Sequence, residues 1–113
     1  MARFFTLREA HALLPQIEPL LRAAVEAKSR GDEVEIEMQA LAARIAMSGG
    51  VEIDPVRVAA RKIDKLRAYR QVHEAVEEIQ GAGVLIKDLD SGLIDFPALL
   101  GEREVYLCWK LGE

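Results

Sequence analysis

The stretch SGGVEIDP, residues 48–55, separates two long helical patterns and thereby decides the fold. Gly49-Gly50 ends the first helix, because glycine readily adopts the left-handed conformation found at helix C-termini. Asp54-Pro55 begins the second, since aspartate is a good N-cap and proline fits the first helical position. We therefore expect two helices that fold back on each other about this connection.

Apolar residues before the connection follow a seven-residue repeat, which predicts one helix over residues 16–47. The two series of the repeat are Ile17, Ala24, Gly31, Met38 and Ile45, and Leu20, Ala27, Val34, Leu41 and Ser48. The repeat keeps its phase across Gly31, although a glycine there costs about 1 kcal/mol of helix propensity. Two helices joined by a turn at residues 30–32 are the alternative.

A separate short helix is expected over residues 7–14. Thr6 and Glu9 have the spacing of a capping box, in which each side chain bonds the other residue's backbone N–H. Pro15 and Pro19 each remove an amide donor and clash with the preceding turn, which predicts a break near Pro15.

The second helix is predicted over residues 55–80, with Gly81 and Gly83 as its stop. Its expected apolar face comprises Ala59, Ile63, Leu66, Tyr69, His73, Val76 and Gln80. Acidic residues crowd positions 32–37 and basic residues crowd 57–70. An antiparallel hairpin brings these two segments together, although each exposed ion pair contributes only about 0–1 kcal/mol.

Beyond Gly83, three short segments are rich in β-branched and aromatic residues: VLIKDL (84–89), GLIDF (92–96) and EVYLCWK (104–110). They predict a three-stranded antiparallel meander, with Pro97 at a strand end because proline cannot donate to a ladder. The expected fold is a single α+β domain over 1–113: a short N-terminal helix, a long antiparallel helical hairpin and a β-meander. The helical part covers 6–81 and the meander covers 83–111.

The stretch KDLDSGLIDFP (87–97) admits two hairpin registers. A three-residue loop with a bulge at a left-handed Gly92 places Lys87 opposite Asp95, a favourable pair. A two-residue loop at Ser91-Gly92 places Asp88 opposite Asp95 instead, which requires a cation or a proton. We favour the first register because it needs no ligand. It also gathers four apolar residues on one face: Val84, Ile86, Ile94 and Phe96.

Composition excludes several classes of function. The net charge of −4 argues against a general nucleic-acid binder. The single cysteine rules out an intramolecular disulfide, and the sequence shows neither a signal peptide nor an apolar run long enough to span a membrane. A cytoplasmic protein is expected. No phosphate loop, dinucleotide fingerprint, zinc spacing or nucleophile elbow is present.

The remaining polar candidates have simple structural explanations. His73 and Glu77 lie one helical turn apart, but Arg70 stands where a di-metal motif needs glutamate, so His73 is expected to be partly buried or at an interface. His11 has no nearby ligand in the sequence. Cys108 lies in an apolar strand and is expected to pack as a small apolar side chain. For the basic run 57–70 we favour pairing with the facing acidic segment, and binding of a nucleic acid or another acidic polymer is the alternative.

Two segments, FTLREAHALLP (5–15) and GVLIKDLDSGLIDFPALLGEREVYLCWKLGE (83–113), resemble an uncharacterised prokaryotic family catalogued as domain of unknown function 2203. The resemblance implies no activity, substrate or catalytic residues. It does imply that family members commonly continue past the equivalent of CWKLGE into a tail with an aromatic-His segment.

Two long helices cannot enclose their own apolar stripes, so a non-enzymatic protein-protein interaction module is the leading hypothesis. We expect a homodimer joined through the helices, with no catalytic residue and no cofactor. The interface candidates are Val34, Met38, Leu41 and Ile45. The alternative is a metal-binding protein or metal-dependent enzyme that uses Asp88, Asp95 and Glu104.

Overall fold

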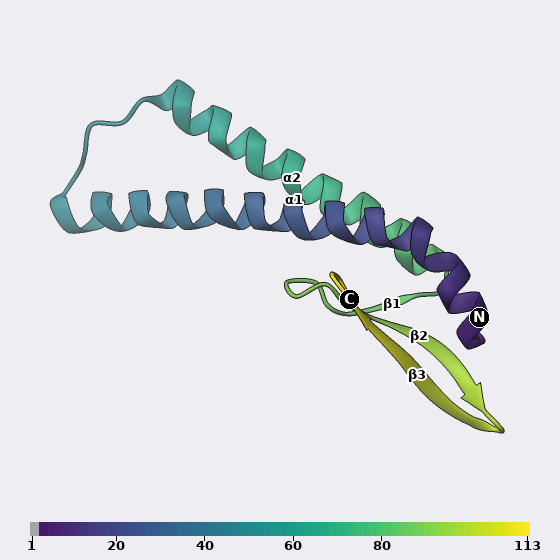
Figure 1. The fold of residues 1–113 in the computed structure, drawn as a ribbon. Coiled ribbons are helices and arrows are strands. Elements are labelled where there is room, and N and C mark those ends of the chain that lie inside the picture. Colours follow the sequence, from purple (N-terminus) through teal and green to yellow (C-terminus); the bar gives the residue numbers. More distant parts are fainter. Residues whose placement is uncertain (1–2) are drawn as a thin grey trace.

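The computed structural model describes residues 3–113 and contains two helices followed by three strands (Figure 1). Helix α1 spans Leu7–Ser48 and α2 spans Pro55–Gly81. Strands β1 (Leu85–Asp88), β2 (Leu93–Leu100) and β3 (Arg103–Lys110) form an antiparallel sheet in the order β1-β2-β3. The α+β class, the helical hairpin and the β-meander are therefore confirmed.

The predicted caps are present at the start of both helices. The Glu9 N–H donates to the Thr6 hydroxyl at 3.1 Å, and the Thr6 N–H donates to the Glu9 carboxylate at 2.9 Å. The Asp54 carboxylate accepts from the Val56 N–H at 3.0 Å. Between the helices, Gly49 adopts a left-handed φ of 74°, as a helix C-cap requires.

The expected short helix over residues 7–14 and the break near Pro15 are wrong, because α1 is continuous. Pro15 and Pro19 both lie on the exposed side of α1, whereas Ile17 lies on the opposite side and is 1% exposed. The N-terminal turns of α1 bend toward the sheet (Figure 1), which places the prolines on the convex side, where their clash with the preceding turn is relieved. Burial of the concave side offsets the two lost hydrogen bonds.

Helix α1 also passes through Gly31 without a turn, so the alternative of two helices is wrong. Gly31 is buried against Tyr69 of α2, and a Cβ at this position would lie only 2.5 Å from the Tyr69 ring atom Cε1. The glycine therefore permits a close approach of the two helices. The Tyr69 hydroxyl donates to Asp32 Oδ1 at 2.8 Å, which fixes the ring over this gap.

The apolar series that predicted α2 is only partly buried. Ile63 and Leu66 are 49% and 64% exposed, whereas Tyr69 and Val76 have reduced exposure and Tyr69 packs against Gly31 of α1. A second stripe with reduced exposure also follows spacings of three and four: Val58, Arg61, Lys65, Ala68, Val72, Ala75 and Ile79. The polar members of this stripe escaped the prediction, because Arg61 and Lys65 approach α1 through ion pairs with glutamates on α1 rather than through apolar contact.

The hydrophobic core lies where the base of the hairpin meets the inner face of the sheet. Phe5 packs edge-on against Phe96, with ring centroids 5.3 Å apart. The core comprises Phe5, Ala10, Ile17, Leu21, Ile79, Val84, Ile94 and Phe96. Ile86 packs against this cluster, so the predicted apolar face of the β1-β2 hairpin is confirmed.

Neither predicted register of the β1-β2 hairpin forms. Leu85 lies opposite Asp95 and Asp88 lies opposite Leu93, so Lys87 is an extra residue in a β-bulge. Lys87 therefore does not pair with Asp95, and the like-charge pair of the second register is also absent. Sequence reasoning placed a bulge only at the loop, with Gly92 left-handed, whereas the register shift lies within β1 between Ile86 and Asp88 and brings Ile86 opposite Ile94 on the core face.

Pro97 lies inside β2, opposite Tyr106, rather than at a strand end. The Pro97 carbonyl accepts from the Phe5 N–H at 2.7 Å, so the backbone at this residue turns away from β3. β1 ends its pairing at Asp95, which leaves this side of β2 free at Pro97. A proline is tolerated here because its missing N–H faces no strand partner.

Candidate interaction surface

The two helices pack closely only near the sheet and diverge toward their connection (Figure 1). The last buried residue of α1 is Val34 and the first of α2 is Ala68. We call residues 35–67 the hairpin tip; none of them is buried. This is unusual for paired helices, because most of the stability of a helix in a protein comes from packing of its apolar face.

The hairpin tip is nevertheless rich in apolar side chains. Thirteen large hydrophobic side chains are exposed among the described residues, and seven of them belong to the tip. These seven are Ile36, Ile45, Met47, Ile53, Val56, Ile63 and Leu66. Met47 is 89% exposed, and exposed apolar side chains gathered in one part of a molecule are typical of an interaction site.

The end of α1 is apolar around its whole circumference. Between Met38 and Met47, Arg44 is the only charged residue. One stripe (Met38, Leu41) faces the groove toward α2, whereas Ile45 and a second stripe (Ile36, Ala40, Ala43, Met47) are exposed and do not line it. A helix that is hydrophobic all round is normally buried. Packing against α2 alone cannot bury both stripes.

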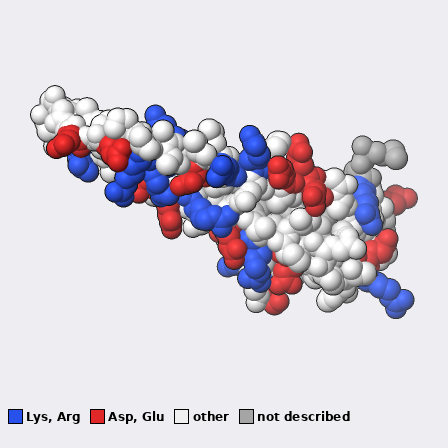
Figure 2. Space-filling view, turned by 90° about the horizontal axis from the view of Figure 1, so that it is seen from above, with Lys and Arg blue, Asp and Glu red and all other residues white. Residues whose placement is uncertain are grey.

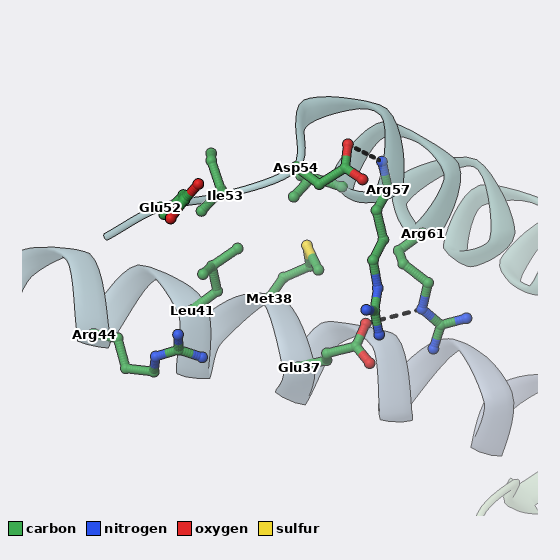
Figure 3. Close-up of a pocket in the computed structure, with 10 residues that line it drawn as sticks. Glu37, Met38, Leu41, Arg44, Glu52, Ile53, Asp54, Arg57 and Arg61 are labelled. Atoms are coloured by element: carbon green, nitrogen blue, oxygen red, sulfur yellow. Dashed lines mark hydrogen bonds and ion pairs between the residues drawn. The ribbon is translucent and has the colours of Figure 1, made fainter. Parts of the chain in front are cut away.

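An open groove of about 320 Å³ lies between the diverging helices at the tip (Figure 3). Its floor is apolar: Met38 and Leu41 from α1, Ile53 from the connection and Val58 from α2. Guanidinium and carboxylate groups form its rim, and Glu37 and Arg61 bridge the two helices at one end with a 2.9 Å ion pair. The groove therefore offers an apolar floor between charged walls.

Ion pairs between the helices follow the predicted charge pattern. Lys65 Nζ lies 2.9 Å from Glu35 Oε2, and Arg61 Nε lies 2.9 Å from Glu37 Oε2. The bond from Lys65 lowers the pKa of Glu35, and the bond to Glu37 raises the pKa of Arg61. Both pairs are partly exposed, so they set the orientation of the helices more than their stability.

Charges are interleaved along the middle of the hairpin, whereas the end that carries the α1-α2 connection is mostly uncharged (Figure 2). The four predicted interface residues become more exposed toward the α1-α2 connection. Val34 is buried within the hairpin at 3% exposure, so it is part of the intramolecular packing. Met38 and Leu41 are half-buried in the groove, and Ile45 is exposed.

The acidic residues of the β1-β2 hairpin each have a local partner. The Ser91 hydroxyl donates to Asp88 Oδ2 at 2.7 Å. Asp90 Oδ1 lies 2.6 Å from Lys28 Nζ, an ion pair that ties the hairpin loop to α1. Asp32 and Asp90 together raise the pKa of Lys28. Sequence reasoning did not identify Lys28, because only the fold brings it to the loop.

The three proposed metal ligands are spread over the outer face of the sheet. Asp95 lies opposite Cys108 on β3, whereas Glu104 lies opposite Leu99, four pairs along the ladder, or about 13 Å at the usual rise per residue. The Tyr106 hydroxyl donates to Glu104 at 3.2 Å. Among residues 3–113 there is no group of three or more His, Cys, Asp or Glu side chains able to hold a metal ion.

His73 and Cys108 are more accessible than predicted. His73 Nε2 lies 3.0 Å from Glu77 Oε1 on the outer surface of α2, and the His73 side chain is 72% exposed. Cys108 is exposed on the outer face of β3 instead of packing as a small apolar side chain. Desolvation by its neighbours and the Asp95 carboxylate raise the pKa of the Cys108 thiol, which is the opposite of what an activated nucleophile needs.

Fold and surface together define a class of protein: an α+β protein with an extended helical hairpin whose tip is apolar and unpacked. The chain belongs to the family described as "Uncharacterized conserved protein (DUF2203)", whose model matches residues 3–113. No curated protein and no solved structure matches the chain significantly. In the part of the chain that the structure describes, neither helix has an apolar stretch suited to crossing a membrane.

Proposed function

We propose that this protein is a cytoplasmic, non-enzymatic interaction module that forms a homodimer by coiled-coil packing of two hairpin tips. The observation that supports this proposal is the difference in packing between the two halves of the hairpin. Its base is packed, while residues 35–67 contain none of the buried residues and more than half of the exposed large hydrophobic ones. A second pair of helices converts the tip into a four-helix bundle, in which both stripes of α1 gain partners.

A second copy of this chain fits the tip better than an unrelated surface because of its charges. On the α1 side, Glu35 and Glu37 pair with Lys65 and Arg61 of the same protomer, whereas Glu33 has no ion pair within the described residues; the α2 side carries a surplus of basic residues. Within the described part of the protomer, none of the ion pairs involves Arg57, Lys62 or Arg67. A two-fold axis that sets α1 of one protomer against α2 of the other brings acidic residues toward these basic ones twice.

Substitution at the tip tests the dimer. Met47→Glu changes a side chain that is 89% exposed, so it leaves the protomer intact while burying a charge in the proposed interface. Leu41→Glu does the same in the groove. In both variants, light scattering is expected to show a smaller molar mass, because the tip contact is lost. Helical circular dichroism should show that the protomer still folds.

Ala23→Glu is the matched control. It adds the same charge to an exposed position of α1 in the packed half of the hairpin, so association should be unchanged. A wild-type protein that is monomeric at micromolar concentration would overturn the proposal. So would tip variants that associate as well as the control.

The metal-dependent alternative is tested separately. Elemental analysis of protein purified without chelator is the measurement. Stoichiometric metal that is lost in Asp95→Ala would favour the alternative over the interaction module. Metal-free protein that still associates through the tip would favour the module.

A further inference from the structure

The two edges of the sheet are protected very differently. The β1 edge has four residues, is interrupted by the bulge at Lys87 and carries charge. The β3 edge has eight residues and pairs with β2 in an unbroken register. Between Glu104 and Lys110 it has no charged residue and no proline. Natural proteins protect an edge strand by keeping it short, by bending it with a bulge, by placing charged residues on it or by covering it. Between Glu104 and Lys110, β3 is not short, bulged or charged.

The backbone of β3 is in the right phase to accept another strand. Because Pro97 turns its backbone toward Phe5, the Pro97-Tyr106 pair exchanges no hydrogen bonds, and the Tyr106 N–H and C=O point to the free edge. By alternation, the backbone groups of Glu104 and Cys108 also point there. At the end of the strand, both backbone groups of Lys110 bond to Glu113. The Lys110 N–H donates to the Glu113 carboxylate at 3.3 Å, and the Lys110 C=O accepts from the Glu113 N–H at 3.0 Å.

The inner face of β3 is incompletely covered by the helices. Val105, Leu107 and Trp109 all point toward the core side, and none of them is buried. The equivalent residues of β2, Ile94 and Phe96, are at most 2% exposed. A further strand beside β3 would cover the inner face at the point where the helices leave it open.

We propose that β3 pairs antiparallel with β3 of a second copy, centred on Leu107, to form a continuous six-stranded sheet. In this register Tyr106 lies opposite Cys108 of the second copy, and both residues direct their backbone groups at each other, which gives four ladder hydrogen bonds. Glu104 lies opposite Lys110 twice, so the strand is complementary in charge to itself. A shift of two residues in either direction removes both Glu104-Lys110 pairs.

This contact is independent of the hairpin tip, because the sheet lies at the base of the hairpin, away from the tip (Figure 1). A protein that uses both surfaces assembles beyond a dimer. The sheet contact therefore adds a second interface to the proposed function without relying on it.

Disulfide trapping tests the register. One chain carries Tyr106→Cys together with Cys108→Ser, and the other is the wild-type chain with an affinity tag. Directly opposite residues have Cα atoms about 5.5 Å apart, within disulfide range. The two copies of residue 106, like the two copies of residue 108, lie diagonally across the pair, about 7–8 Å apart and beyond that range.

Mild oxidation of the mixture is therefore expected to give the mixed disulfide dimer in several-fold excess over either homodimer on a non-reducing gel. A mixture that gives no mixed dimer overturns the pairing. Wild-type chains that cross-link to each other through Cys108 as readily as the mixture does would overturn the register.

Mass measurements separate this contact from the tip contact. Cys108→Pro removes an N–H that faces the free edge and leaves the bonds to β2 in place. The wild type is expected to form assemblies larger than a dimer. Leu41→Glu and Cys108→Pro should each form dimers through the interface that remains. The double variant Leu41→Glu/Cys108→Pro should be a monomer. Cys108→Lys, which charges the edge, replaces the proline variant if that variant unfolds.

The two proposals fail in different ways. Unchanged wild-type mass in both Cys108 variants overturns the sheet contact and leaves the tip contact standing. A molar mass of Leu41→Glu equal to that of the wild type overturns the tip contact and leaves the sheet contact standing.

Discussion

Replacing Gly31 by alanine tests whether the hairpin depends on a close approach of α1 and α2 at this point. In an exposed helix the change would stabilise the protein by about 1 kcal/mol, because alanine has the higher helix propensity. Here the new Cβ would lie 2.5, 2.8 and 2.9 Å from three atoms of the Tyr69 ring, so the ring or the helix must move. Overpacking of this kind costs about 1–3 kcal/mol, and moving the ring also loses the hydrogen bond to Asp32.

The expected net effect is a loss of about 1–2 kcal/mol, which lowers Tm by roughly 4–8 °C in a chain of this size. Urea and thermal unfolding at a fixed protein concentration measure it. Gly81→Ala is the matched control, because no atom lies within 4 Å of its new Cβ, and it should not destabilise the protein. In a Tyr69→Ala background the sign should reverse, since the new methyl group then enters free space. Gly31→Ala at or above wild-type stability in the native background would refute the reasoning.

Two further predictions concern the ends of the packed region. Thr6→Ala should cost about 1 kcal/mol as a lost N-cap. The Thr6 backbone N–H and hydroxyl lower the pKa of Glu9, so this stabilisation is present above the unfolded pKa of the carboxyl and is lost as pH falls through its folded pKa. Thermal unfolding from neutral pH down to about pH 3 should therefore show a shallower acid decline in Glu9→Gln, and an unchanged decline would contradict this. Lys28→Met removes the ion pairs to Asp32 and Asp90 and should cost about 1 kcal/mol or less. Urea unfolding should show the difference shrinking at high salt, and a salt-independent difference would mean that packing of the side-chain stem dominates.

The helical hairpin could be predicted because its signals are local. A capping box at Thr6, an Asp-Pro start and a Gly-Gly stop each act through the backbone within a few residues. The short connection makes the helices antiparallel, and the opposite charges of α1 and α2 agree with this orientation. None of these signals depends on tertiary contacts.

The failed predictions all depended on tertiary context. Proline interrupts a helix by local rules, but the burial of Ile17 on the opposite side kept α1 continuous through Pro15 and Pro19. Gly31 looked like a weak point because its partner, Tyr69, lies on the other helix. Arg61 and Lys65 were not recognised as part of the packing stripe of α2, because periodicity counts apolar residues, whereas these two approach α1 through ion pairs.

The hairpin register failed for a related reason. Neither predicted register placed a bulge within β1, and only the docking of the loop onto Lys28 and the pairing of Ile86 with Ile94 reveal it. The candidate surface at the tip was partly predictable: Met38, Leu41 and Ile45 belong to it, whereas Val34 is used inside the protomer.

The uneven packing of the hairpin links the proposed dimer to the folding of the tip. The turns of α1 beyond Val34 contain no buried residue, so they have less tertiary support than the base of the hairpin. The proposed tip contact would supply that support as the protein concentration rises. With this contact, amide hydrogen exchange is expected to slow at the tip, but not at the base, as the protein is concentrated.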